Sequence, residues 1–392
     1  MQPYRQVSAL LTGVFLLIAG LGVVNLVTPL RAKIEGFPEI AIGLLGSFYF
    51  GGMLAGAFAA PFIIRRAGPI GAFAGFSLVS GAIVLAMPGL VAPWAWLLLR
   101  AAMGFAFAGL YAVIEGWINA TATNANRGAL YGFYQIVNFG ASLAGQYVLT
   151  FEAASSFSAF AIPAALFALA ASPLWLSKGE PPAVRPRSAR VSLRWLARLS
   201  PVGVLAAFLV GAANGAHGSL APIYALGVGF SPETAPWFTM AVSLGSALGV
   251  YPAGRLTDGR DRRKAMVAMA TIGALVEIVL AMAPGGEATL VVLGFVGGLL
   301  TFTLYTLTAS HANDHATADE VVLISSGLLF VYCIGAIAGP ALAAVLMRAF
   351  GPGALYAQNA GAHLVLAAFA LAYLLRRPAG AARIKAAAEV SP

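Results

Sequence analysis

The fold is decided by the stretch Gly254-Arg255-Leu256-Thr257-Asp258-Gly259-Arg260-Asp261-Arg262-Arg263-Lys264, which places a dense cluster of charges between two long apolar segments. Such a cluster is very costly inside a bilayer, but it suits a short loop between two membrane helices. Gly254 and Gly259 allow tight turns, and Asp258 is expected to pair with nearby arginines. The basic excess predicts that the loop faces the cytoplasm.

The composition predicts a polytopic membrane protein. The 392-residue chain is 60% hydrophobic and only 9% charged, whereas soluble domains carry about 25% charged residues. At about 20 residues per span, the length fits twelve helices. The net charge of +9 is explained by basic loops, so no nucleic-acid partner is expected. The one cysteine, Cys333, excludes an intramolecular disulfide.

Twelve apolar spans are predicted, with both termini in the cytoplasm. The segments that then lie outside hold only Arg31, Lys33 and Arg348, and the other loop cations lie inside, as the positive-inside rule requires. The first span is too long for a signal peptide and lacks a cleavage site, so no removal is expected. The predicted spans are 7–30, 40–62, 70–88, 94–117, 128–150, 157–177, 201–227, 235–254, 265–283, 289–310, 321–347 and 354–375.

The chain divides into two related halves. Residues 1–177 form a first six-helix half, 178–200 a charged cytoplasmic linker, and 201–392 a second half with a short cytoplasmic tail. Phe15 to Pro29 aligns with Phe208 to Pro222, which lies 193 positions later, and Leu110-Tyr111 aligns with Leu304-Tyr305 at 194 positions. Parallel repeats of six helices are typical of one large class of secondary transporters.

The quoted loop resembles the signature of the major facilitator superfamily, which reads roughly G-x-L-x-D-R-x-G-R-R. Gly254, Leu256, Asp258, Arg262 and Arg263 keep the pattern, and the residues at 259 and 261 depart from it. The resemblance implies an all-α polytopic membrane protein, with twelve transmembrane helices in two pseudo-symmetric six-helix bundles. It also implies a secondary transporter of the cytoplasmic (inner) membrane, working as a monomer, rather than an enzyme.

Two further stretches are similar to the YcaD-like branch of that superfamily. They are Glu115-Gly116-Trp117-Ile118-Asn119 and Ser310-His311-Ala312-Asn313-Asp314. The substrates of this branch are poorly defined, so the likeness implies no particular solute.

Arg100 is the first candidate for substrate binding, because ionisable groups at membrane depth are costly and functional by default. The pattern Arg100-x-x-x-Gly104-x-x-x-Ala108 resembles the fourth-helix motif of the superfamily, whose arginine lines the cavity or contributes to proton coupling. Hydrogen bonding to helix carbonyls is the structural alternative. A buried cation without an acidic partner favours an anionic or zwitterionic solute.

Other polar residues complete the predicted substrate pocket. In the fifth span, polar residues recur every three or four positions on one helical face, which must meet either a cavity or another helix. In the seventh span, His217 is also a candidate proton switch. The remaining predicted substrate-binding residues are Asn25, Tyr111, Gln135, Asn138, Asn214 and Tyr305.

Gating or coupling is predicted for Glu115, Asp258, Arg262, Arg65 and Arg127. Glu115 is expected near the inner face, where arginines are available for a gating salt bridge. Arg65 stands where the second half has Asp258, so the two halves cannot make identical latches.

Several kinds of chemistry are not supported by any motif. A Walker loop is lacking, and no residue cluster has metal-site or hydrolytic geometry, so neither metal nor cofactor is expected. Glu277 is expected to snorkel or to make a structural hydrogen bond, with a coupling role as the alternative. The sequence thus predicts transport of a small organic solute by alternating access, with protons as one candidate coupling ion. Efflux of amphipathic toxic compounds and passive facilitation remain alternatives.

Overall fold

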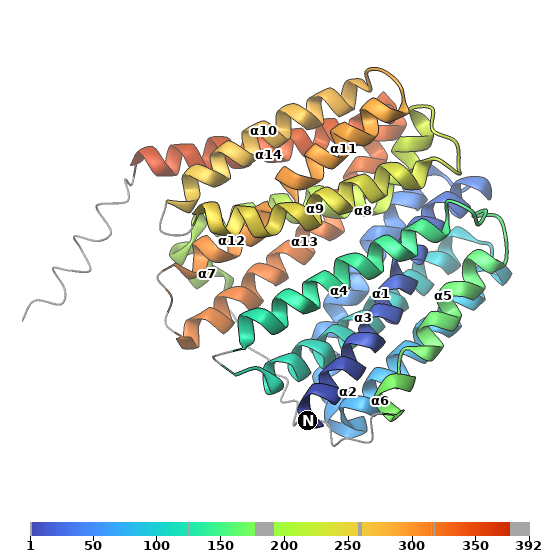
Figure 1. Cartoon of the computed structure of the whole chain (residues 1–392). Helices are drawn as coiled ribbons and strands as arrows, with labels where there is room; N and C mark the ends of the chain where they lie inside the picture. Colours follow the sequence, from blue (N-terminus) through green and yellow to red (C-terminus); the bar gives the residue numbers. More distant parts are fainter. Residues whose placement is uncertain are drawn as a thin grey trace, which may run out of the picture.

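The computed structural model describes residues 2–123, 126–176, 192–257, 261–314, 316 and 318–376. Throughout that part of the chain the regular structure is helical, which confirms the predicted all-α fold (Figure 1). The helices are α1 (Gln2–Ile34), α2 (Glu39–Ala86), the 3-10 turn η1 (Met87–Gly89), α3 (Pro93–Thr121), α4 (Arg127–Val148), α5 (Ser158–Leu169), α6 (Ser172–Leu176), α7 (Leu193–Leu199), α8 (Pro201–Gly227), α9 (Ala235–Thr257), α10 (Arg262–Met282), α11 (Glu287–Thr301), α12 (Leu304–Asn313), α13 (Ala318–Phe350) and α14 (Ala354–Arg376).

The helices supply the twelve predicted crossings. Among the described residues, 9 helical stretches are long and apolar enough to span a membrane. One of them, α2, contains two spans, because Gly68 breaks it with a φ of 72° and ψ of 165°. A positive φ favours glycine. Helices α4 and α9 complete the set: α9 contains the shorter apolar stretch Ala235–Val250, and α4 carries the polar residues of the fifth predicted span.

Some predicted spans are broken where the sequence interrupts helical hydrogen bonding. The span 157–177 is split into α5 and α6. Pro173 follows the break, and proline has no N–H to donate to the preceding turn. The span 289–310 is split at Phe302 and Thr303 into α11 and α12.

Helices α1 to α6 form an N-terminal half, and α8 to α14 form a C-terminal half beside it. In Figure 1 the blue-to-green helices of the first half lie next to the yellow-to-red helices of the second. The exact boundaries of the two halves stay a prediction, since residues 177–191 of the linker lie outside the described residues.

The two halves repeat the same close helix contacts. A Cβ added at Gly145 of α4 would clash with the backbone oxygen of Ala19 on α1, and one added at Gly339 of α13 would clash with that of Ala212 on α8. These positions differ by 194 and 193 residues, the spacing of the sequence repeat. Close backbone approach at small residues is how membrane helices associate without a hydrophobic driving force. The same offsets relate the contacts Gly52–Ala101 and Gly245–Phe295, and Gly104–Tyr49 and Gly298–Val242.

The halves are joined mainly toward one end, here called the loop end, which carries the connections 35–38 and 351–353. The opposite end, with the start of α1 and the end of α14, is called the terminal end. Toward the loop end, Ser47 Oγ of α2 donates to the Ile337 carbonyl of α13 at 2.6 Å. Gln146 Nε2 of α4 donates to Ser243 Oγ of α9 at 3.1 Å. These contacts close the loop end between the halves.

Candidate functional site

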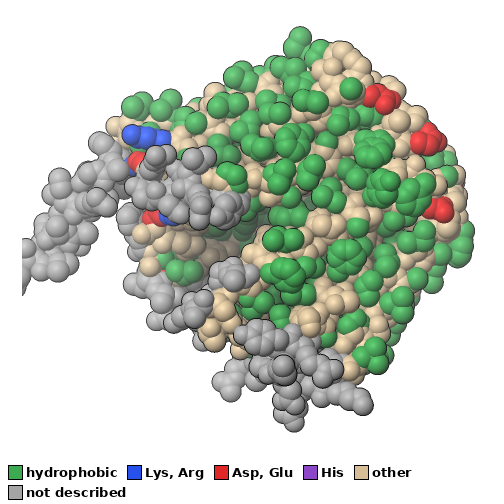
Figure 2. Space-filling model, in the orientation of Figure 1, with side chains coloured by type: hydrophobic (Ala, Val, Ile, Leu, Met, Phe, Trp, Pro, Cys, Tyr) green, Lys and Arg blue, Asp and Glu red, His purple; other side chains and the backbone are tan. Residues whose placement is uncertain are grey.

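One face of α3 runs from a buried end to an exposed end. Arg100, Tyr111 and Glu115 share that face, because 11 and 4 residues correspond to nearly whole turns of an α-helix. Arg100 is buried, Tyr111 is half-buried and Glu115 is exposed. Glu115 also lies within electrostatic reach of Tyr305 in the other half. The face therefore becomes more exposed toward the terminal end, where Figure 2 shows the surface hollowed; this hollow is called the central cavity.

Arg100 forms the deep part of this face without an acidic partner among the described residues. Its guanidinium stacks over the Tyr49 ring at 4.5 Å from the centroid. Nη2 donates to Asn25 Oδ1 at a long 3.3 Å, and Nη1 lies 3.6 Å from Met103 Sδ. Nε makes no hydrogen bond. The structure thus brings Arg100 and Asn25 together as predicted, and leaves the cation incompletely satisfied.

Tyrosines from both halves surround the cavity above Arg100. Tyr134 of α4 lies within electrostatic reach of Glu115 and hydrogen-bonds Asn138. On the other side, Tyr305 of α12 packs edge-on against Tyr332 of α13, with ring centroids 4.8 Å apart. Tyr332 in turn hydrogen-bonds Asn214 of α8. Tyr332 and Tyr134 extend the predicted pocket. Tyr134 lies one helical turn before Asn138 on α4, whereas Tyr332 and Tyr305 lie on different helices, so spacing along the chain could not select Tyr332.

The polar stripe of α4 serves different purposes along its length. Near the loop end, Gln146 is buried and bonds to Ser243 of α9 at the seam between the halves. Gln135 and Asn138 lie farther from that seam; Gln135 is exposed and Asn138 half-buried. Helix contact, one of the two predicted alternatives, therefore applies at Gln146, and cavity lining by Gln135 and Asn138 stays a prediction. A Cβ added at Gly145 of this helix would meet the backbone of α1, whereas one added at Gly140 would meet nothing within 4 Å.

His217 faces a separate pocket inside the C-terminal half. Its Nδ1 lies 3.0 Å from the Tyr356 hydroxyl, and the side chain is 8% exposed. Glu277 lines the same pocket and is 3% exposed, so of the two expected alternatives the structure shows the hydrogen bond and not snorkelling. Glu277 is hydrogen-bonded to His363 Nδ1 at 2.7 Å. Sequence reasoning missed His363, Tyr356 and Asn359, although their spacing of 3 and 4 on α14 marks one helical face.

The predicted gating residues are only partly visible. Asp258 and the side chain of Arg127 lie outside the described residues, and Arg65 is exposed. Arg262 forms an ion pair with Asp314 of α12, within its own half. In the described part of the chain Glu115 forms no ion pair, so its gating role stays a prediction.

Asp261 forms the N-cap of α10 next to this ion pair. Its carboxylate accepts from the Arg263 backbone N–H at 3.1 Å and from the guanidinium at 2.9 and 2.7 Å. These hydrogen bonds from Arg263 lower the pKa of the Asp261 carboxyl. A capping carboxylate of this kind satisfies free N–H groups at the helix start, so the residue at 261 that departs from the family signature has a structural use here. In the described ranges, no group of three metal-ligating side chains is found.

Two related helical halves around a central polar cavity define a membrane transport protein. The profile described as Major Facilitator Superfamily matches residues 10–231 and again 203–391. The chain therefore belongs to the Major Facilitator Superfamily, and it is a secondary transporter with the alternating-access fold, not an enzyme.

Relatives and solved structures agree with this assignment. An uncharacterized MFS-type transporter of Yersinia enterocolitica is 28% identical over 385 residues, covering 95% of this chain and 96% of the relative. The uncharacterized MFS-type transporter YcaD of Escherichia fergusonii is 27% identical over 378 residues, covering 95% and 94%, in line with the predicted branch. In fold, the chain is similar to the nucleoside transporter NupG (TM-score 0.78, 13% identity, 94% and 98% covered). It is also similar to a D-xylose-proton symporter (TM-score 0.66, 16% identity, 93% and 95% covered).

Proposed function

We propose that this transporter moves a small organic solute with an anionic group across the inner membrane, and that Arg100 binds that group. The observation that carries the proposal is the incomplete satisfaction of Arg100. The side chain is 6% exposed, its Nε is unpartnered, and among the described residues its neighbours are an amide, a ring and a thioether. A carboxylate or phosphate would supply the missing charge and hydrogen bonds.

The cavity geometry supports a binding order. Glu115 stands at the wide part of the cavity and Arg100 at its closed floor. A solute would enter past the tyrosines and reach Arg100 last. Rocking of the two halves around this site would then open the loop end. A zwitterion fits this scheme as well as a simple anion, because the tyrosine hydroxyls accept hydrogen bonds from an ammonium group.

Both termini are proposed to lie in the cytoplasm, which makes the cavity inward-facing. The positive-inside distribution supports this orientation. The test is labelling of Glu115→Cys, in a Cys333→Ala background, with a membrane-impermeant maleimide. Inverted vesicles should label, and right-side-out vesicles should not. The reverse pattern would contradict the orientation.

The first experiment is a thermal-stability screen of the purified protein against organic anions, zwitterions and antimicrobial compounds. A ligand that binds only the folded state stabilises it by about 2.7 kcal/mol at a hundredfold excess over Kd. The proposal predicts that an organic anion stabilises the parent and Arg348→Ala but not Arg100→Ala. Arg348 is the matched control because it is an exposed arginine at the end of α13. Stabilisation of Arg100→Ala to the same degree would overturn the proposal.

A second candidate function is efflux of amphipathic compounds. The observation that favours it is the ring of tyrosines from both halves, including Tyr111, Tyr134 and Tyr305, with Glu115 as the exposed charge among them. Aromatic faces attract organic cations. This function predicts that lipophilic cations stabilise the parent and lose their effect in Glu115→Gln. It also predicts that cells lacking the protein become more sensitive to those compounds.

A further inference from the structure

The pocket inside the C-terminal half lies where the repeat places Arg100 in the N-terminal half. Tyr49, Arg100 and Gly104 correspond by the offsets of 193 and 194 to Val242, Gly294 and Gly298, all of which line the pocket. In the N-terminal half, the guanidinium of Arg100 occupies this position. In the C-terminal half the corresponding residue, Gly294, has no side chain, and polar side chains from other helices occupy the position instead.

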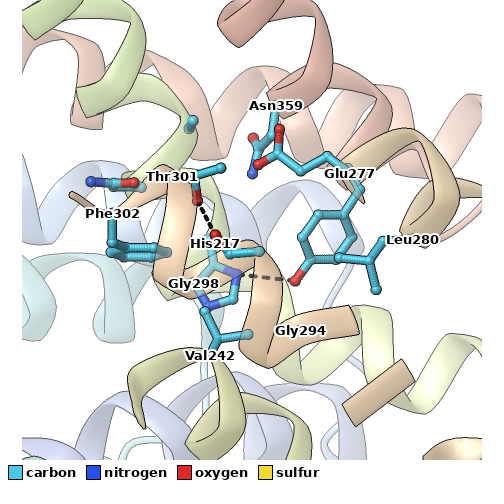
Figure 3. A pocket seen from close by; sticks show the side chains of 13 residues that line it. His217, Val242, Glu277, Leu280, Gly294, Gly298, Thr301, Phe302 and Asn359 are labelled. Carbon is cyan, nitrogen blue, oxygen red and sulfur yellow. Dashed lines mark hydrogen bonds between the residues drawn. The ribbon is translucent and has the colours of Figure 1, made fainter. Parts of the chain in front are cut away.

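The groups that enter the pocket are acidic, basic and amide side chains. Figure 3 shows Glu277 and Asn359 beside each other, with His217 on another wall. The pocket leaves about 10 Å³ for the centre of a water molecule, which is about the space that one buried water needs. The Asn359 Oδ1 and the His363 Nε2 make no hydrogen bond, although their side chains are 2% and 0% exposed.

Glu277 and His363 form a buried acid–base pair away from the central cavity. The His363 Nδ1 and Glu277 Oε2 are 2.7 Å apart, with side-chain exposures of 0% and 4%. Neither Lys nor Arg lines the pocket, so no fixed cation neutralises the carboxylate. A buried carboxylate is retained only when it is paired or protonated. The occupancy of the pair by protons therefore sets the charge of the pocket.

The other titratable groups around the pair come from two helices. Tyr356 of α14 lies within electrostatic reach of Glu277 and of Tyr224 on α8, and His217 of α8 is bonded to Tyr356. From α9 and α11 the pocket receives Val242, Gly294, Gly297, Gly298 and Thr301, none of them titratable. Helices α12 and α13 contribute no titratable lining residue; Phe302 lies at the break before α12.

A polar route connects the pocket to the central cavity. Asn214 lines the pocket and is hydrogen-bonded to Tyr332. Tyr332 packs on Tyr305, which is within electrostatic reach of Glu115. Polar side chains of α8, α12 and α13 therefore lie between the pair and the central cavity, where a proton would have to move.

We propose that the Glu277–His363 pair is an exchangeable proton-binding site that couples solute movement to the proton gradient. The inference rests on the proposed transport function and adds its coupling ion. The proton comes from water in the central cavity, resides on the carboxyl or the imidazole, and returns to water after the halves have rocked. Glu277 and His363 lie within one half, so the site travels with that half and needs no contact with the solute.

The direct test is pH-dependent infrared difference spectroscopy of the purified transporter, which needs no solute. As the pH is lowered, the difference spectrum should gain a protonated-carboxyl band from the pair. Glu277→Gln should remove the band and His363→Asn should change it, while the exposed control Glu287→Gln should keep it. A spectrum of the parent without such a band, or a band unaffected by Glu277→Gln, would overturn the site.

A flux assay separates this inference from the proposed function. In proteoliposomes, a solute found by the stability screen should accumulate when a proton gradient is applied. Glu277→Gln should lose this accumulation but keep downhill exchange of the same solute, which also shows that the variant is folded. If the parent exchanges solute but ignores the gradient, proton coupling fails and the transport proposal stands. If the band titrates but no solute moves, the transport proposal fails.

Discussion

The two halves share a framework and differ in how they hold their buried charge. In the N-terminal half, Arg100 lies on the cavity face of α3 with no acidic partner among the described residues. In the C-terminal half, the equivalent position is Gly294, and Glu277 with His363 supplies charges that neutralise each other. Under the two proposals, an anion from outside completes the site in the first half, and bound protons complete the site in the second.

This difference shows how two repeats of one scaffold can hold two different sites. Helix contacts at glycine recur with the repeat spacing in both halves, so the backbone of the site is conserved within the chain. The side chains at the equivalent place are not. Arg100 lies at the central cavity, whereas the Glu277–His363 pair lies between α10 and α14 inside the C-terminal half. Each half therefore contributes a different chemistry to one transport cycle.

The largest expected effect comes from breaking the acid–base pair. Glu277→Ala should lower the free energy of unfolding by about 3 to 5 kcal/mol, the usual cost of removing one partner of a buried ion pair. Arg100→Ala should cost clearly less, because no acidic partner is left behind. Denaturation in detergent measures both. Equal losses in the two variants would remove the contrast between the halves, and Glu277→Gln serves as the milder control.

An intermediate effect is expected at the repeated helix contacts. Gly145→Ala and Gly339→Ala should each cost about 1 to 3 kcal/mol, because the added methyl forces the helices apart. Gly140→Ala is the control, since nothing lies within 4 Å of its added Cβ, and it should be neutral or slightly stabilising. If the unfolding midpoint falls in only one of the two variants, Gly145→Ala or Gly339→Ala, the halves do not share this packing.

The smallest effect belongs to the cap of α10. Asp261→Ala should destabilise the protein by about 1 kcal/mol at neutral pH, as loss of an N-cap does. Because hydrogen bonds from Arg263 lower the pKa of Asp261, the stabilisation is present above the unfolded pKa of about 3.9. This stabilisation is lost as the pH falls through the lower pKa that Asp261 has in the folded protein. The difference in free energy of unfolding between the parent and Asp261→Ala should therefore disappear in acid. The variant Asp261→Asn keeps a capping side chain, so its free energy of unfolding should fall by about 0.5 kcal/mol or less. A gap that widens in acid would contradict this assignment.

The sequence predicted most of the fold, because the charged loop and the 193-residue repeat constrain the whole chain. Apolar periodicity then located each span, and errors arose where local backbone breaks, such as those at Gly68 and before Pro173, merge or split helices. Arg100, Tyr111 and Glu115 could be predicted as one face, because helical spacing within a single element is readable.

The acid–base pair could not be predicted in the same way. His363 and Glu277 are 86 residues apart on different helices, and nothing in spacing along the chain specifies that α10 and α14 pack together with these side chains facing. His217 illustrates the same limit, because α8 borders both the cavity and the inner pocket. Only tertiary packing decides which side it faces.

The central claim is that Arg100 binds the solute, and solute counterflow in proteoliposomes tests it most directly. The organic anion that stabilises the protein in the thermal screen would serve as the labelled solute. The account predicts counterflow by the parent and by Arg348→Ala, and loss of counterflow by a folded Arg100→Ala, with at most weak activity in Arg100→Lys because lysine lacks the planar fork of donors. Undiminished counterflow by Arg100→Ala would contradict the account.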